Sequence, residues 1–222
     1  MGSQEIVFEK IKNDFQLLSK IVMKQLNFDK QLLGKQPDMA IMPEIEVNEG
    51  LIDSLEVKLR SEMISSIVLY APRAIDLRKI IAYYDMTAYM ERIGDHLLNV
   101  SHRLSSIDRT GDIYQSIQPA LEKLFDVVDV MTQNAIFAFA CEDNLLAIKT
   151  IAADDRADLL HAQIMESLSE TSAGMALTKK QLSDILQIGV LAANLERIGD
   201  NATNIAESAI YIIEGRDIKH HG

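Results

Sequence analysis

The stretches MERIGDHLLNVSHRL (residues 90–104) and LERIGDNATNIAESA (residues 195–209) share the pentapeptide ERIGD, whose two copies lie 105 residues apart. In both stretches apolar residues recur every three or four positions, which is typical of a helix that buries one side. The two apolar stripes consist of Met90, Ile93, Leu97, Val100 and Leu104, and of Leu195, Ile198, Ala202, Ile205 and Ala209. The chain is therefore predicted to contain a duplicated helical unit.

The same period continues through most of the 222 residues, in which glycine and proline are scarce and aromatic residues make up 5%. This composition favours an all-α fold. Pro43 and Pro72 can each occupy the first turn of a helix, and Thr178 with Gln181 forms a capping box. We expect six helices, at about residues 3–33, 43–70, 72–106, 112–140 (or from Pro119), 143–172 and 178–214.

The polar segment 108–111 contains a glycine and separates the two copies, so it marks the junction between halves. The sequence predicts two tandem homologous three-helix bundles of antiparallel helices, at residues 1–107 and 108–222. Aligning Phe15 with Phe125 gives an offset of 110 for the first helix of each half, so the first half has a longer loop.

Each half carries two pairs of acidic residues, and both pairs have the form acid, three residues, acid. The offset of 105 relates the pairs upstream of ERIGD just as it relates the two copies of ERIGD. Residues four apart lie on the same side of a helix, and these acids face away from the apolar stripe. The predicted metal ligands are Glu49, Asp53, Glu91 and Asp95 in the first half, and Asp154, Asp158, Glu196 and Asp200 in the second.

A single acidic pair on a helix surface is usually just solvated, although like charges four apart cost a few tenths of a kcal/mol. Two pairs on neighbouring helices, however, can converge across a groove and hold a cation. Oxygen ligands suit iron, manganese, magnesium or calcium, and zinc is possible. Several carboxylates could hold more than one ion, and Asn99 and Asn204, four residues beyond the motif aspartates, could orient or complete the ligand shell.

The net charge of −11 makes nucleic acid and anionic lipid improbable partners and favours cations or basic protein surfaces. The single cysteine, Cys141, excludes a disulfide framework and a thiolate zinc site. The sequence has no run of about 18 apolar residues, and its N-terminus lacks the basic segment followed by a hydrophobic run that is typical of a signal peptide. We therefore expect a cytoplasmic protein without membrane insertion.

Four motifs together resemble the PhoU family of phosphate-signalling regulators over essentially the whole chain. They are APRAIDLR (residues 71–78), ERIGD twice, NIAE (residues 204–207) and the ending IIEGRDIKH (residues 212–220). The resemblance implies two three-helix bundles side by side, with multinuclear clusters of iron or zinc on the acidic motifs; manganese or magnesium is possible.

The same resemblance implies a function that is not enzymatic. The family members act as negative regulators of phosphate uptake and phosphate-starvation signalling, between the phosphate-specific ABC transporter and the phosphate-sensing histidine kinase. A homodimer is also possible. Asp154 stands where the counterpart is Glu49, and His96 and His102 correspond to Asn201 and Glu207, so the two clusters could differ in metal number or affinity.

Two other functions remain open. One is a metal-free helical scaffold that binds a basic partner. The other is a carboxylate-bridged di-iron enzyme, to which His161, three residues after Asp158, points. Such sites need the motif twice inside a bundle core, whereas the counterpart of His161 is Glu56. We therefore disfavour the enzyme and treat His161 as a surface residue or an extra ligand.

The residues inside ERIGD carry two further predictions. Arg92 and Arg197 are interpreted as forming ion pairs with acids of the other bundle, with binding of an anion beside the cations as an alternative. Gly94 and Gly199 each cost about 1 kcal/mol relative to alanine in mid-helix, so a packed helix or a metal cluster is expected to approach them closely.

Overall fold

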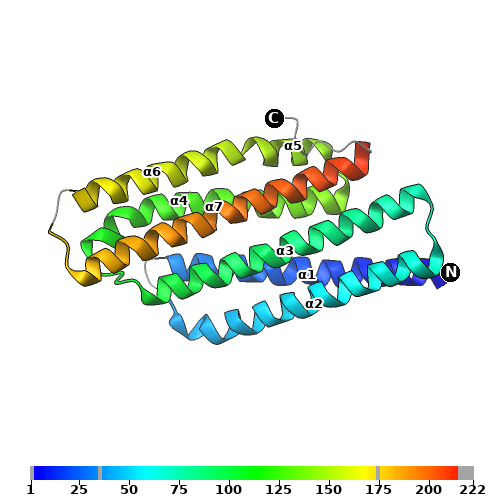
Figure 1. Ribbon diagram of the computed structural model, residues 1–222, viewed down its shortest axis with the longest axis horizontal. Helices are drawn as coiled ribbons and strands as arrows, with labels where there is room; N and C mark the ends of the chain where they lie inside the picture. The colour runs from blue at the N-terminus through cyan, green and yellow to red at the C-terminus, as the bar shows by residue number, and fades with distance from the viewer. Residues whose placement is uncertain (1–2, 35–36, 174–175, 215–222) are drawn as a thin grey trace.

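The computed structural model describes residues 3–34, 37–173 and 176–214, and these residues contain helices and turns but no strand. The elements are α1 (Ser3–Leu33), the 3-10 helix η1 (Met39–Ile41), α2 (Met42–Tyr70), α3 (Ala74–Ser106), α4 (Asp112–Cys141), α5 (Asn144–Ala152), α6 (Asp154–Ala173) and α7 (Lys179–Glu214). Their long axes run nearly along one direction (Figure 1).

Two bundles lie side by side. The first consists of α1, α2 and α3, and the second of α4, α7 and the α5–α6 pair. The helices that carry ERIGD, α3 and α7, lie next to each other in the middle of the molecule (Figure 1), and α1 also contacts α4. The predicted all-α architecture of two tandem three-helix bundles is confirmed.

Most predicted helix boundaries agree with the structure, but the start of α3 does not. Pro43 lies in the first turn of α2, as expected. Pro72 lies outside α3, which begins at Ala74 with Arg73 as its N-cap. Ala71 adopts a left-handed conformation with φ 42° and ends α2, so Pro72 belongs to the turn. Residues 215–220 of the last motif lie outside the described residues.

The helix expected over residues 143–172 is interrupted at Ala153. The amide of Ala153 donates to the carbonyl of Thr150 at 3.1 Å, and the amide of Arg156 donates to the carbonyl of Ala153 at 3.1 Å. Bonds that span three residues tighten the backbone, as in a 3-10 turn. The break makes Asp154 the first residue of α6, so it sets where this predicted ligand lies.

Helix α4 begins at Asp112 and accommodates Pro119 in its interior, so the earlier of the two expected starts is correct. Within the described part of the chain, α4 is the one helix long and apolar enough to cross a membrane. Over half of its most apolar stretch, 56%, is buried against the other helices. Leu121, Leu124 and Val128 are fully buried, which is what a core helix of a helical bundle requires.

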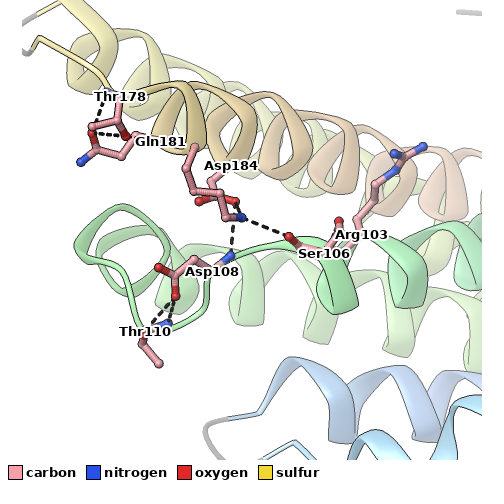
Figure 2. A network of polar contacts seen from close by, with 8 residues as sticks. Arg103, Ser106, Asp108, Thr110, Thr178, Gln181 and Asp184 are labelled. Carbon is pink, nitrogen blue, oxygen red and sulfur yellow. Dashed lines mark hydrogen bonds and ion pairs between the residues drawn. The ribbon is translucent and has the colours of Figure 1, made fainter.

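Polar contacts join the two halves near the junction predicted at residues 108–111. The backbone amide of Asp108 donates to the Asp184 carboxylate at 3.2 Å (Figure 2). The Lys180 ammonium group donates to the same carboxylate at 2.5 Å and to the carbonyl of Ser106 at 3.2 Å. Nearer the other end of α3, the Tyr83 ring packs edge-on against Phe15 and Phe139 with centroid distances of 4.9 Å.

The capping box at the start of α7 is confirmed. The amide of Thr178 donates to Gln181 Oε1 at 2.9 Å, and the amide of Gln181 donates to Thr178 Oγ1 at 3.2 Å (Figure 2). The reciprocal bonds satisfy amides that have no partner within the helix. They fix the start of the helix that carries the second ERIGD.

Candidate metal centres

Three of the four predicted ligands of the first half converge between α2 and α3. One carboxylate oxygen from each of Glu49, Asp53 and Asp95 lies within 4.8 Å of the other two. Glu49 and Asp53 come from one side of α2, one turn apart, and Asp95 comes from ERIGD on α3. We call these three residues the first cluster.

The glycine of ERIGD allows α3 to approach α2 at this level. A Cβ atom on Gly94 would lie 2.9 Å from Cδ1 and 3.2 Å from Cγ2 of Ile52. Ile52 is fully buried and directly precedes Asp53. The expectation of a close approach at Gly94 is therefore met by a packed helix, and the approach brings Asp95 to the acids of α2.

The second half repeats the arrangement at the positions that the offset of 105 predicts. Carboxylate oxygens of Asp154, Asp158 and Asp200 lie within 4.8 Å of one another, and these residues are the second cluster. Asp154 and Asp158 come from α6 and Asp200 from α7. A Cβ atom on Gly199 would meet only ordinary contacts, the nearest being Val128 Cγ1 at 3.4 Å. The close approach expected there is looser than at Gly94.

The glutamates of the two ERIGD motifs flank these clusters without joining the groups of three. The charges of Asp95, Glu56 and Asp53, after burial itself, raise the pKa of Glu91. After burial, Glu196 is the largest cause of the raised pKa of Asp200. Both glutamates thus add negative potential at the clusters.

Burial and mutual repulsion raise the pKa of acids in both clusters. For Glu49 the causes are burial, then the charges of Asp53 and Asp95; for Asp95 they are burial and Asp53. For Asp154 the pKa rises because of burial and the charge of Asp200, partly offset by the Thr203 hydroxyl. Each cluster is therefore a place where a cation would relieve unfavourable charge.

A histidine distinguishes the second cluster from the first. His161 Nε2 is buried and accepts or donates no hydrogen bond among the described residues, and the ring is close enough to lower the pKa of Asp200. Its counterpart Glu56 instead makes a 2.6 Å ion pair with Arg60. A buried polar atom without a partner is costly, so His161 fits the role of an additional nitrogen ligand.

The asparagines that follow each motif bond to their own helix. Asn99 Nδ2 donates to the carbonyl of Asp95 at 2.9 Å, and Asn204 Nδ2 donates to the carbonyl of Asp200 at 2.8 Å. Each amide group therefore supports the backbone beneath its cluster, which leaves only the amide oxygen to face a cation.

The ion pairs predicted for Arg92 and Arg197 are wrong. Neither guanidinium lies within 4.0 Å of a carboxylate in the described part of the chain. Arg92 lies over the Tyr89 ring instead, 5.8 Å from its centroid. The two halves are joined at this level by His96 Nδ1 and Asn194 Oδ1, which are 3.0 Å apart.

The donor sets fit divalent or trivalent metal ions. Three convergent carboxylates on two rigid helices offer the oxygen ligands that hard cations prefer, and a neighbouring imidazole suits iron or zinc. None of the eight predicted ligands belongs to the buried core, so ions have access from solvent.

Comparisons with known proteins agree with the repeat. The model of the PhoU domain family matches residues 15–104 and residues 121–209, one match in each half. A relative from Aquifex aeolicus, named phosphate-specific transport system accessory protein PhoU homolog, is 29% identical over 96% of this chain and 93% of its own length. A relative of the same name from Zymomonas mobilis is 30% identical over 75% of this chain and 68% of its own length.

Solved structures agree as well. The crystal structure of PhoU from Pseudomonas aeruginosa is 26% identical and superimposes with a TM-score of 0.85, covering 96% of this chain and 99% of that chain. A phosphate transport system regulatory protein PhoU from Streptococcus pneumoniae, 16% identical, has the same fold, with a TM-score of 0.81. With both halves matched by the family model and the bundles superimposing on a solved member, this chain belongs to the PhoU family.

Proposed function

We propose that this protein is a metal-binding negative regulator of phosphate uptake and phosphate-starvation signalling that acts in the cytoplasm. The observation that carries the phosphate role is the match of both halves to the PhoU domain family. The relatives' name describes them as accessory proteins of the phosphate-specific transport system, which supports a role in regulating phosphate transport rather than in catalysis.

The proposed partners are the phosphate-specific ABC transporter and the phosphate-sensing histidine kinase. In this proposal the protein links the two, so that starvation genes remain off when phosphate is plentiful. A homodimer would present two copies of each surface to these partners.

The metal part of the proposal rests on the two clusters at repeat-related positions. Glu49, Asp53 and Asp95 would hold ions in the first half, and Asp154, Asp158 and Asp200 in the second, with Glu91, Glu196 and His161 close by. Iron or zinc is the proposed metal, with manganese or magnesium as alternatives. Bound ions would neutralise the carboxylates and join α2 to α3 and α6 to α7.

The regulatory role is tested by deletion of the gene with a reporter of phosphate-starvation genes. We expect the reporter to be switched on in rich phosphate and switched off again by the wild-type gene. A reporter that stays off after deletion contradicts the proposal.

The role of metal is tested in the same strain with the double variant Asp95→Ala and Asp200→Ala. Loss of repression, with the variant present at wild-type level, supports regulation through the clusters. A variant that binds no metal but represses normally supports the metal-free scaffold instead.

A further inference from the structure

A basic pocket opens between α4 and the α5–α6 segment, and its lining residue Ala153 directly precedes Asp154 of the second cluster. Its volume is about 330 Å³. The α4 side contributes Lys123, Asp126, Val127, Val130, Met131 and Asn134, and the opposite side contributes Lys149, Thr150, Ala153 and Arg156. Small-molecule sites are typically concavities of about 300–1,000 Å³, so the pocket has the size of a ligand site.

Three cationic side chains line this pocket although the chain carries a net charge of −11. In the described part of the chain, none of Lys123, Lys149 and Arg156 forms an ion pair within 4.0 Å. The one carboxylate in the lining, Asp126, pairs with Lys30 on α1 at 2.9 Å. The pocket therefore presents uncompensated positive charge.

The internal repeat shows that two lining residues of this pocket differ in charge from their counterparts in the first half. In the first half, Lys24 on α1 and Glu44 on α2 form an ion pair at 3.5 Å. The residues at the corresponding repeat positions are Asn134, at an offset of 110, and Lys149, at an offset of 105. An ion pair that spans two helices has thus been replaced by an amide and an unpaired cation, both of which line the pocket.

We propose that this pocket binds an organic phosphate: a small molecule with a phosphate group and a ring or other apolar part. Lysine and arginine on the rim supply charge-assisted hydrogen bonds to phosphate oxygens. Val127, Val130, Met131 and Ala153 supply an apolar surface for the rest of the ligand, and the Asn134 amide can hydrogen-bond to a polar edge of the ring. The site requires no metal ion and does not depend on the proposed regulatory role.

Calorimetric titration of the full chain with three probes tests the ligand class. AMP carries both phosphate and ring, inorganic phosphate carries only the charge, and adenosine carries only the ring. We expect AMP to bind at least about tenfold more tightly than either of the others, and to bind equally well after treatment with a chelator. Binding of inorganic phosphate alone would overturn the organic part of the proposal. Binding that disappears with the metal would assign the anion to the clusters instead.

A variant based on the repeat assigns the site. The double variant Asn134→Lys and Lys149→Glu restores the ion pair of the first half, and we expect it to reduce AMP binding at least about tenfold. Lys20→Gln, on the exposed face of α1, changes the net charge by the same amount and should bind AMP as the wild type does.

Arg156→Gln provides a second, milder test and should weaken binding of AMP more than that of adenosine. Circular dichroism must show unchanged helix content for each variant. AMP affinity that is the same in the double variant, in Arg156→Gln and in the wild type would overturn the proposal, as would the absence of AMP binding in the wild type.

Discussion

A Cβ atom on Gly94 would lie 2.9 Å from Cδ1 of Ile52, closer than non-bonded carbon atoms pack. The two residues belong to α3 and α2, and each directly precedes an aspartate of the first cluster. The contact between Gly94 and Ile52 therefore sets both the distance between α2 and α3 and the distance between the acids of the first cluster. At Gly199 the corresponding contact, to Cβ of Ala157 on α6, is 3.7 Å.

Gly94→Ala should be less stable than Gly199→Ala by about 1–3 kcal/mol. Alanine in mid-helix gains about 1 kcal/mol over glycine, and at Gly199 the added methyl group meets only ordinary contacts. At Gly94 the methyl group overpacks a fully buried isoleucine, which typically costs about 1–3 kcal/mol. Urea denaturation of the metal-free proteins measures the difference.

Ile52→Val provides the matched control because it removes the Cδ1 atom that Gly94→Ala would meet. Combined with Gly94→Ala, it should be less destabilising than the sum of the two single changes. Strict additivity would show that this contact does not limit the approach of α2 to α3.

Asp95→Ala and Asp200→Ala should each remove metal from one half only. Each variant takes one carboxylate from a group of three and leaves the other group intact. Elemental analysis of the purified proteins should show a partial loss in each single variant and the sum of the two losses in the double variant. Wild-type metal content in both single variants would contradict the ligand assignment.

Without metal, the protein should lose stability as the pH rises above the ordinary carboxyl range. The pKa values of Glu49, Asp95, Asp154 and Asp200 are raised in the folded state, so the folded state holds more protons than the unfolded state there. The stabilisation is present below the unfolded pKa of about 4 and is lost as each carboxylate ionises.

The expected change in melting temperature between about pH 5 and about pH 7.5 is modest, because these carboxylates face solvent and screening weakens their repulsion. A saturating metal ion should flatten or reverse this dependence, since the ion binds the ionised carboxylates. A metal-free protein whose melting temperature rises over this range would contradict the electrostatic account of the clusters.

Asp29→Asn should stabilise the protein at neutral and higher pH. Asp29 is fully buried, burial raises its pKa well above the usual value, and the Ser101 hydroxyl donates a hydrogen bond to its carboxylate. Asparagine keeps an acceptor for Ser101 and removes the cost of ionising a buried acid. Melting of the wild type and the variant should therefore diverge as the pH rises; parallel curves would show that Asp29 does not titrate with unfolding.

The helices and the repeat could be predicted because one buried face leaves a regular period in the sequence. The helix over residues 3–33 and the capping box at Thr178 are found where the sequence predicts them. The interruption at Ala153 could not be foreseen, because the segment IAADD contains no glycine or proline. A change from backbone hydrogen bonds that span four residues to bonds that span three cannot be recognised from the composition of the segment.

The clusters could be predicted only in part. The repeat identified the eight acids but did not show which of them converge. Glu91 and Glu196 lie outside the two groups of three. That outcome depends on the rotation of each helix about its own axis, which spacing alone does not fix. The spacing of three residues from Asp158 marked His161 as a possible extra ligand, but spacing predicted neither the burial of its nitrogen nor the packing of Arg92 on Tyr89.

Ala153 lines the basic pocket, and the next residue, Asp154, contributes a carboxylate to the second cluster. A molecule bound in that pocket would contact the turn at Ala153 and so shift Asp154, the first proposed ligand of α6. In the first half, α2 is continuous over the residues that correspond to this turn. If both proposals hold, a ligand in the pocket would change the metal affinity of the second centre and leave that of the first unchanged.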